Sequence, residues 1–280
     1  MGNILLTTGG WKGDPFLPAI KAVLPQLEAY AAACGADMAV VDWPLDPAGK
    51  RGIFAQRLLI PKAYAKYDVV VHMDFDILIP RNLSNIFACI PAEAGFAAIV
   101  DPRGSPAYEK AWGHAEWTRE SHQEFFRRMG LVSDKTLLTV NGGVQAFRPR
   151  LIADLMESWY RDDRRFDSRY KQNNDETHMA YIAQSQGLFA PLDQRFNRQA
   201  LYALHETDLG RTAYRTYRSL PNRIRRKLCK TVGLRSDHVG LGRLYTLFVE
   251  DLLRAGNLVH FSGKLPVPHV DPGLLSGSLS

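Results

Sequence analysis

Cysteine is scarce in this chain of 280 residues. The three cysteines, Cys34, Cys89 and Cys229, are widely separated and odd in number. That number and spacing exclude a disulfide framework and a zinc knuckle, because each needs cysteines in matched sets. We expect three reduced thiols, in the core or at the surface.

Long apolar runs are also missing. No stretch approaches the roughly 20 residues that a helix needs to cross a bilayer, and the amino terminus lacks the charged start and apolar run of a signal peptide. No internal repeat or low-complexity tract is visible. With 46% hydrophobic and 23% charged residues, the chain is long enough for one large domain or two small ones. We expect a globular, cytoplasmic protein.

Positive charge is in excess, with a net charge of +6 and a pI near 9.2. Nucleic acid, an anionic membrane and a phosphorylated substrate are all candidate partners, so the position of the charge matters more than its sum. The densest basic segment, 211–243, has ten Lys and Arg residues and a single acidic residue, Asp237. Its basic residues alternate with apolar ones such as Tyr214 and Leu228, a pattern typical of an interfacial helix. A solvated face is the simpler alternative.

Short apolar runs alternate with helical patterns along the chain. Strands are predicted at 3–8, 38–43, 68–73, 96–100 and 258–261, and the first four are near-continuously apolar, as buried parallel strands are. Pro25 suits the first turn of a helix that ends before Gly35, and a second helical pattern covers 52–66. This alternation predicts a doubly wound α/β fold.

Two aspartates, Asp74 and Asp76, follow the third predicted strand in the stretch "VVVHMDFDILIP". Open α/β sheets bind ligands at the carboxyl ends of their strands. Side chains at i and i+2 of an extended chain share one face, so both carboxylates can hold one divalent cation. A solvated turn after the strand is the alternative.

Three further segments carry polar or glycine residues in unusual places. Asn141, Gly142 and Gly143 interrupt a strand-like run, where glycine is costly unless something approaches the backbone closely; a bulge in an edge strand is the alternative. A helix predicted from 172 opens with polar residues, for which capping is the alternative. A strand ends in His260, followed by glycine and lysine, and a structural histidine is the alternative.

Taken in this order, these motifs resemble those of the metal-dependent GT-A glycosyltransferases, which use a nucleotide-sugar donor, and are most similar to those of the retaining family 8 enzymes. The resemblance implies a mixed, mainly parallel central sheet flanked by helices. The basic segment described above is expected to be a helical insertion into this fold near the carboxyl end. It implies transfer from a nucleotide-sugar, expected to be a UDP-sugar, to a glycan, lipid-linked or other acceptor with retention of configuration.

The resemblance also implies a role for each motif. Asp74, Asp76 and His260 are the expected ligands of Mn²⁺ or Mg²⁺. Asp175 is the expected catalytic residue, and Asn174 or Glu176 takes that role if the match slips by one residue. The residues expected to contact the sugar are Asn141, Gly142, Gly143 and Asp175. Those expected to contact the nucleotide are Thr7, Thr8, Gly9, Arg57, Asp74, Gly263 and Lys264.

The expected organisation follows from these positions. Residues 1–200 form the nucleotide-sugar-binding core, 201–250 a basic helical insertion, 251–270 the final core strand with its metal and phosphate motif, and 271–280 a tail. The aromatic segment 101–126, with Tyr108, Trp112 and Trp117, is a candidate acceptor wall, because aromatic faces stack on sugars; helix packing is the alternative.

Two other classes of protein remain open. The opening "ILLTTGG" also resembles the first loop of two-domain glycosyltransferases that use no metal. A nucleic-acid-binding module could use the basic segment, and its binding would depend on salt rather than on a metal. Neither class accounts for Asp74, Asp76 and His260.

The basic segment 211–243 predicts peripheral binding to an anionic membrane, with each Lys or Arg near the surface worth about 1 kcal/mol. We expect the protein to sediment with anionic vesicles at low salt and to be released as salt rises. Replacing Arg223, Arg225, Arg226 and Lys227 by glutamine should remove this binding without changing donor hydrolysis in solution. If the wild type ignores anionic vesicles, the segment serves as an acceptor lid or a subunit interface instead.

Overall fold

A computed structural model describes residues 2–8, 17–41, 43–49, 51–162, 175–219, 224, 237–262 and 265–277. Its main sheet has six strands in the order β2-β1-β3-β6-β5-β7. These strands are β1 (Asn3–Thr8), β2 (Asp37–Val41), β3 (Val69–Met73), β5 (Phe96–Val100), β6 (Val140–Phe147) and β7 (Phe189–Pro191). Strand β6 pairs antiparallel with β3 and β5, whereas the other pairs are parallel. The predicted mixed, mainly parallel sheet is confirmed.

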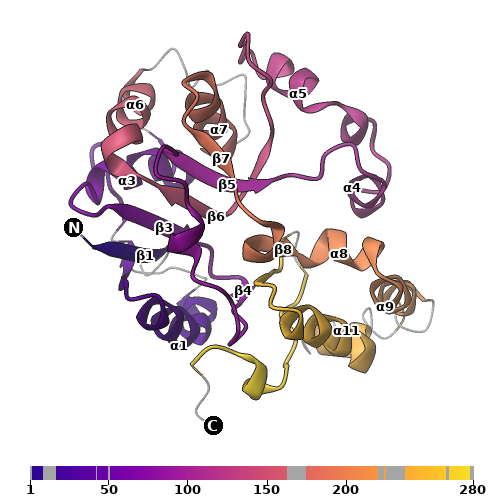
Figure 1. Cartoon of the computed structure of the whole chain (residues 1–280). Helices are drawn as coiled ribbons and strands as arrows, with labels where there is room; N and C mark the ends of the chain where they lie inside the picture. Colours follow the sequence, from indigo (N-terminus) through magenta and orange to yellow (C-terminus); the bar gives the residue numbers. More distant parts are fainter. Residues whose placement is uncertain are drawn as a thin grey trace.

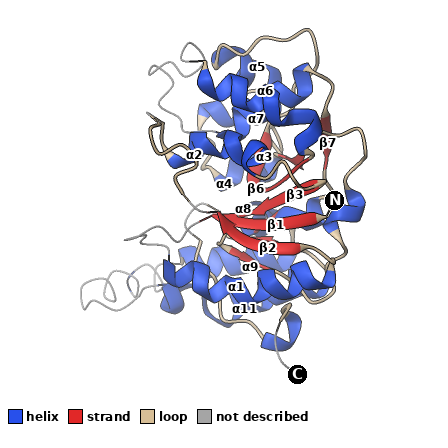
Figure 2. Cartoon of the chain, turned by 90° about the vertical axis from the view of Figure 1, so that its left-hand side faces the viewer, coloured by secondary structure: helices blue, strands red, loops and turns tan. Residues whose placement is uncertain are grey.

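Alternation along the strands explains why their sequences are apolar throughout. In β1, Ile4 and Leu6 join the hydrophobic cluster on one face of the sheet, and Leu5 joins the cluster on the other. Successive side chains of a strand point to opposite faces, so a strand covered on both sides needs apolar residues at every position. Helices lie on both faces of the sheet (Figure 2).

One face is covered by α1 (Leu17–Ala33), through Val23, Leu27 and Tyr30. The prediction that Pro25 starts this helix is wrong, because α1 begins eight residues earlier and Pro25 lies inside it. The buried Ile20 extends the apolar face toward the amino terminus, and Pro25 itself is exposed. The helix ends before Gly35 as predicted, where φ is +66°.

The other face is covered by α6 (Pro149–Arg161) and α7 (Asp175–Ser185), with Met156 and Met179 in the core. Between β2 and β3, the chain forms α2 (Ile53–Gln56), a 3₁₀ turn η1 (Arg57–Leu59) and α3 (Ile60–Ala63). The second helical pattern is therefore broken into three short pieces, with Pro61 in the first turn of the last. The segment 86–128 contains four short helices and turns, η2 (Ile86–Cys89), α4 (Pro106–Ala111), η3 (Glu116–Arg119) and α5 (His122–Arg128).

The last predicted strand lies outside the main sheet. Strand β9 (Val259–His260) forms a second sheet with β4 (Ile77–Leu78) and β8 (Arg198–Gln199), in the order β4-β9-β8. Beside it lie α8 (Ala200–Glu206), α9 (Asp208–Arg218) and α11 (Asp237–Arg254), which share a third hydrophobic cluster (Figure 1). The turns η5 (Gln194–Asn197) and η6 (Pro272–Leu274) complete the described elements. This second sheet joins the carboxyl-terminal part of the chain to the loop after β3.

Only the two ends of the basic segment belong to the described residues, in α9 and the start of α11; apart from Ile224, residues 220–236 lie outside them. Arg211 pairs with Asp208 and donates a hydrogen bond of 2.9 Å to the carbonyl of Glu206, so its charge is used locally. Within the described part of the chain, no helix is long and apolar enough to span a bilayer. Cys34 and Cys89 carry free thiols, and Cys229 lies outside the described residues.

Candidate active site

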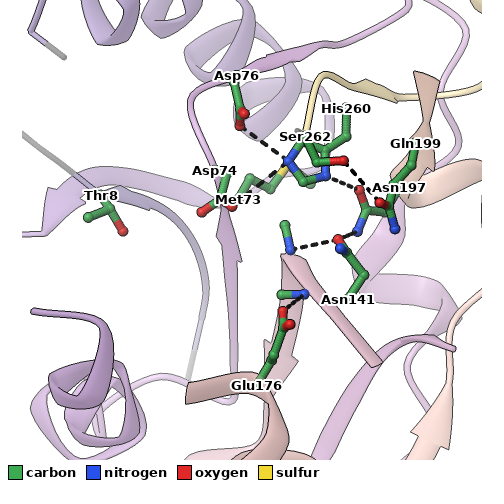
Figure 3. A network of polar contacts seen from close by, with 12 residues as sticks. Thr8, Met73, Asp74, Asp76, Asn141, Glu176, Asn197, Gln199, His260 and Ser262 are labelled. Atoms are coloured by element: carbon green, nitrogen blue, oxygen red, sulfur yellow. Dashed lines mark hydrogen bonds and ion pairs between the residues drawn. The ribbon is translucent and has the colours of Figure 1, made fainter. Parts of the chain in front are cut away.

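The pairing of β4 with β9 places His260 beside the two aspartates. Ile77 is the register partner of His260, and the amide of Phe261 donates to the carbonyl of Asp76 at 2.9 Å. Nε2 of His260 lies 3.2 Å from Oδ1 of Asp76 and 4.0 Å from Oδ2 of Asp74 (Figure 3). The sequence predicted these three residues as ligands, and the structure brings them together.

This group of side chains fits a divalent cation. One ligand atom from each of Asp74, Asp76 and His260 can be chosen so that all lie within 4.8 Å of one another. Two carboxylates and one imidazole suit Mn²⁺ or Mg²⁺ better than a metal that prefers thiolate ligands. The hydrogen bond to Asp76 also shows that the Nε2 edge of the imidazole faces the carboxylates.

The hydrogen bonds behind His260 fix which of its nitrogens carries a proton. Oδ1 of Asn141 accepts from the backbone amide of Gly143 at 3.0 Å, so this atom is the oxygen of its amide group. Nδ2 of Asn197 donates to that oxygen at 2.6 Å, which turns Oδ1 of Asn197 toward Nδ1 of His260 at 2.9 Å. Nδ1 must therefore hold a proton, because two acceptors cannot share a hydrogen bond. Nε2 faces the carboxylates of Asp76 and Asp74, and it is the nitrogen that would bind a metal ion after giving up the proton that it donates to Asp76.

Arg57 holds two carboxylates of the site at once. Its Nη2 lies 2.7 Å from Oδ1 of Asp74, and its Nη1 lies 3.4 Å from Oδ2 of Asp175, the first residue of α7. Burial alone would lower the pKa of Arg57, but the charges of Asp74 and Asp175 outweigh it and raise that pKa. Burial raises the pKa of Asp175 to about 6 against the opposing charge of Arg57. Arg57 lines the cavity beside these two ion pairs, and its contact with the donor stays a prediction.

The glycine segment lies in the middle of the sheet, because β6 runs between β3 and β5. The edge-strand alternative is therefore wrong, although the register of β6 against β5 does shift here. A Cβ at Gly142 would stand 2.6 Å from Oε2 of Glu176, and one at Gly143 would overlap the imidazole of His260. Glycine is needed because two side chains of the site press against this backbone.

Glu176 joins the site through that contact. Its Oε2 accepts the amide of Gly142 at 2.6 Å (Figure 3). Burial, followed by the negative charges of Asp175 and Asp101, raises the pKa of Glu176 to about 8, and the Gly142 hydrogen bond only partly opposes the shift. Both carboxyl groups at the start of α7 therefore have raised pKa values, and that of Glu176 is raised further than that of Asp175.

The predicted metal ligands, the predicted sugar contacts and the aromatic segment 101–126 all contribute to the lining of one cavity of about 960 Å³. Its lining includes Arg57, Asp74, Asp76, Asn141, Gly142, Gly143, Asp175, Glu176 and His260, together with Tyr108, Trp112 and Trp117. Tyr108 is buried, but Trp112 and Trp117 are each 41% exposed. Packing in the protein interior, the alternative to an acceptor wall, therefore explains Tyr108 but not the two exposed tryptophans.

Two of the predicted nucleotide contacts, Thr7 and Thr8, lie within the sheet. The hydroxyl of Thr7 donates to the carbonyl of Met73 at 2.8 Å, and that of Thr8 bonds Nε2 of His72, so both are used within the sheet. Neither is among the described residues that line the cavity. Asn174, Gly9, Gly263 and Lys264 lie outside the described residues. The roles of these residues stay predictions.

Several residues of the site were not found from the sequence. Asn197, which orients His260, comes from η5 and has no motif around it that could have marked it. Asp101 and Arg103 belong to the predicted acceptor segment 101–126 but were not singled out in it; they line the cavity from the end of β5, where the strand-end rule could have marked them. Tyr202 comes from α8, which only tertiary packing brings to the cavity.

No protein-family model matches this sequence, and no curated protein is significantly similar to it. Among solved structures, the bifunctional glycosyltransferase WbbM is similar over 99% of this chain and 48% of its own, with 12% identity and a TM-score of 0.52. This chain thus spans about half the length of WbbM. Mouse xyloside xylosyltransferase 1 matches over 95% of this chain and 99% of its own (12% identity, TM-score 0.45). The galactosyltransferase LgtC, in complex with donor and acceptor sugar analogs, matches over 94% and 87% (15% identity, TM-score 0.41).

The likeness to WbbM shows a fold that occurs in glycosyltransferases. Together with the sheet order, it confirms the predicted α/β fold of the GT-A type. The strands of the core belong to one continuous six-stranded main sheet, which does not support the alternative of a two-domain glycosyltransferase that uses no metal.

The hydrogen bonds of Asn197 predict that it controls metal affinity. Asn197→Ala removes the acceptor of the Nδ1 proton, so the imidazole of His260 loses its fixed orientation, and we expect Mn²⁺ affinity to fall roughly 10- to 100-fold. Titration of Mn²⁺ followed by electron paramagnetic resonance measures this directly. Ser262→Ala is the matched control, because Ser262 bonds Gln199 and lies outside this chain of hydrogen bonds. Equal Mn²⁺ affinity in Asn197→Ala and wild type would contradict the role.

The raised pKa of Glu176 predicts a change of stability with pH. The carboxyl group has a pKa of about 8 in the folded chain and about 4.3 in the unfolded one, so its contribution to stability is present at low pH and is lost as pH rises toward 8. Glu176→Gln keeps an acceptor for the amide of Gly142 but cannot ionise. We expect this variant to gain roughly 1–2 kcal/mol over wild type between pH 5 and pH 8, after discounting for partial exposure.

Urea denaturation across this pH range measures the difference for Glu176→Gln. Glu28→Gln, on the exposed side of α1, controls for the loss of one negative charge. Parallel stability curves for wild type and Glu176→Gln would show that Glu176 is ionised throughout.

Proposed function

We propose that this protein is a metal-dependent glycosyltransferase that transfers a hexose from a UDP-sugar, with retention, to a glycan or lipid-linked acceptor. The observation that carries the proposal is the convergence of Asp74, Asp76 and His260 in a cavity that also holds the buried Asp175. The GT-A type of fold supports it. So does the galactosyltransferase LgtC, which has been solved with donor and acceptor sugar analogs.

Each side chain has a physical role in this proposal. Asp74, Asp76 and His260 would hold Mn²⁺ or Mg²⁺, which supplies positive charge to neutralise the nucleoside diphosphate as it leaves. Arg57 orients Asp74 through one nitrogen and leaves Oδ2 of that residue facing His260. Through its other nitrogen, Arg57 keeps Asp175 ionised enough to face the positive charge that develops on the sugar.

The transfer itself needs no other reactant. The acceptor oxygen forms a bond to the anomeric carbon, while the bond from that carbon to the phosphate oxygen breaks and its electron pair leaves with the nucleoside diphosphate. The acceptor proton passes to the departing phosphate oxygen. Asn141, Gly142 and Gly143 would line the sugar, and Gly263 with Lys264 would contact the diphosphate, as the family resemblance implies.

The organisation of the chain is part of the proposal. Residues 1–200 with 251–270 would form the catalytic core, and 201–250 would face the acceptor or the inner surface of the cell membrane. Membrane docking rests on the charge pattern of 211–243 alone. The proposed location is therefore cytoplasmic and peripheral.

The test is a thermal-shift screen of nucleotide sugars with and without Mn²⁺, followed by an assay of donor hydrolysis. We expect one donor to raise the melting temperature only with Mn²⁺, and chelator to abolish hydrolysis reversibly. Asp76→Ala should lose both effects, because a metal ligand is gone. Asp175→Asn should keep the nucleotide-dependent shift but lose roughly a hundredfold or more in turnover.

The two variants separate metal holding from sugar stabilisation. Full donor hydrolysis in the presence of chelator would contradict the proposed metal role of Asp74, Asp76 and His260. An unchanged turnover in Asp175→Asn would move the catalytic role to Asn174 or Glu176.

A further inference from the structure

An exposed pair of tryptophans stands at one side of the cavity. Trp112 follows the last residue of α4, and Trp117 lies in η3, with ring centroids 5.6 Å apart and planes inclined at 55°. Each is 41% exposed, although both are large apolar side chains. The turn between them contains two successive residues with positive φ, Gly113 at 70° and His114 at 58°. Such a backbone is rare for a residue other than glycine, and here it brings the two rings together.

The tryptophan rings are held in place by their neighbours. Nε1 of Trp112 donates to the hydroxyl of Tyr202 at 3.3 Å, and Tyr108 packs against Trp117 at 6.1 Å in a T-shaped arrangement. Nη1 of Arg103 donates to the carbonyl of Trp117 at 3.3 Å. The side chains are therefore fixed before any ligand binds, which lowers the entropy that binding would cost.

Beside the tryptophans are two buried polar atoms of opposite kind. Oδ1 of Asp101 and Nε of Arg103 have no hydrogen-bond partner among the residues that the structure describes. Both residues line the cavity. Asp101 also hydrogen-bonds Tyr202, and a ligand in the cavity would meet both a carboxylate and a guanidinium in its lining.

The chemistry of these atoms restricts that ligand. A carboxylate accepts hydrogen bonds and a guanidinium donates them. A hydroxyl group can donate to the first and accept from the second, whereas a phosphate only accepts and an ammonium only donates. Two inclined aromatic faces add a requirement for an apolar, flat surface. A neutral pyranose ring offers both features, with C–H groups on one face and hydroxyls around its edge.

We propose that Trp112 and Trp117 bind the acceptor as a neutral pyranose, whose apolar face lies on the indoles and whose hydroxyls bond Asp101 and Arg103. This inference rests on the proposed function, because it fills the same cavity as the metal site. It names the acceptor class as a carbohydrate, and it excludes a serine or threonine side chain and a phospholipid headgroup.

The test compares acceptors and variants. A panel of octyl β-pyranosides (glucoside, galactoside, mannoside, xyloside) is set against a serine-containing peptide and phosphatidylglycerol vesicles, with the donor found by thermal shift. We expect transfer to at least one pyranoside and to neither of the other two. Trp112→Ala and Trp117→Ala should raise the KM for the pyranoside roughly tenfold or more with a smaller effect on kcat. Phenylalanine at either position should recover most of the loss, because an aromatic face returns.

Asp101→Asn tests the polar half of the site, and we expect a similar rise in KM for the pyranoside. Leu155→Ala is the control, because Leu155 is exposed on α6 and outside the cavity. Circular dichroism establishes that each variant is folded.

The outcomes separate this inference from the proposed function. If the wild type neither binds nor hydrolyses any nucleotide sugar, the proposed function fails. If it hydrolyses a donor but glycosylates the peptide or the lipid, or if the tryptophan variants keep the wild-type KM, only the pyranose site is overturned.

Discussion

The candidate site depends on one interaction, the double ion pair of Arg57 with Asp74 and Asp175. Asp74, Asp175 and Glu176 all approach the same buried region, and burying carboxylates without a counter-charge is costly. The guanidinium of Arg57 contacts Asp74 and Asp175 together, and it extends from a 3₁₀ turn that packs against α6 and α7. Because one rigid cation fixes two carboxylates from different elements, the end of β3 and the start of α7 are held at a defined separation.

Two further carboxyl groups of the site, those of Asp76 and Glu176, form no ion pair with Arg57 among the described residues. Among the described residues, Arg57 forms its ion pairs with Asp74 and Asp175, whereas Asp76 pairs with His260. Burial would raise the pKa of Asp76, but the hydrogen bond from His260 outweighs it and lowers that pKa. Glu176 accepts the backbone amide of Gly142, and its burial raises its pKa. The cavity is thus lined both by the three residues that can hold a cation and by Glu176, whose carboxyl group has a raised pKa.

The sequence predicted the elements that local patterns encode. Apolar runs placed β1, β3 and β5, and the strand-end position of Asp74 and Asp76 predicted a site before any contact was known. Pro25 misled the prediction of α1, because a proline inside a helix is tolerated where its side chain is exposed and the apolar face continues on both sides. The glycine segment was recognised as unusual, but the reason, contact with Glu176 and His260, involves residues 34 and more than 100 positions away.

The sequence by itself determined the α/β fold, the two adjacent carboxylates and the histidine that follows a strand, since each is a feature of consecutive residues. The tertiary structure decided which residues meet. The pairing of β4 with β9 brings His260 to Asp76, and η5 brings Asn197 behind the imidazole, where a chain of hydrogen bonds from the amide of Gly143 selects the protonated nitrogen. Contacts of this kind join segments far apart in the chain, so their register and distance depend on packing that no local pattern encodes.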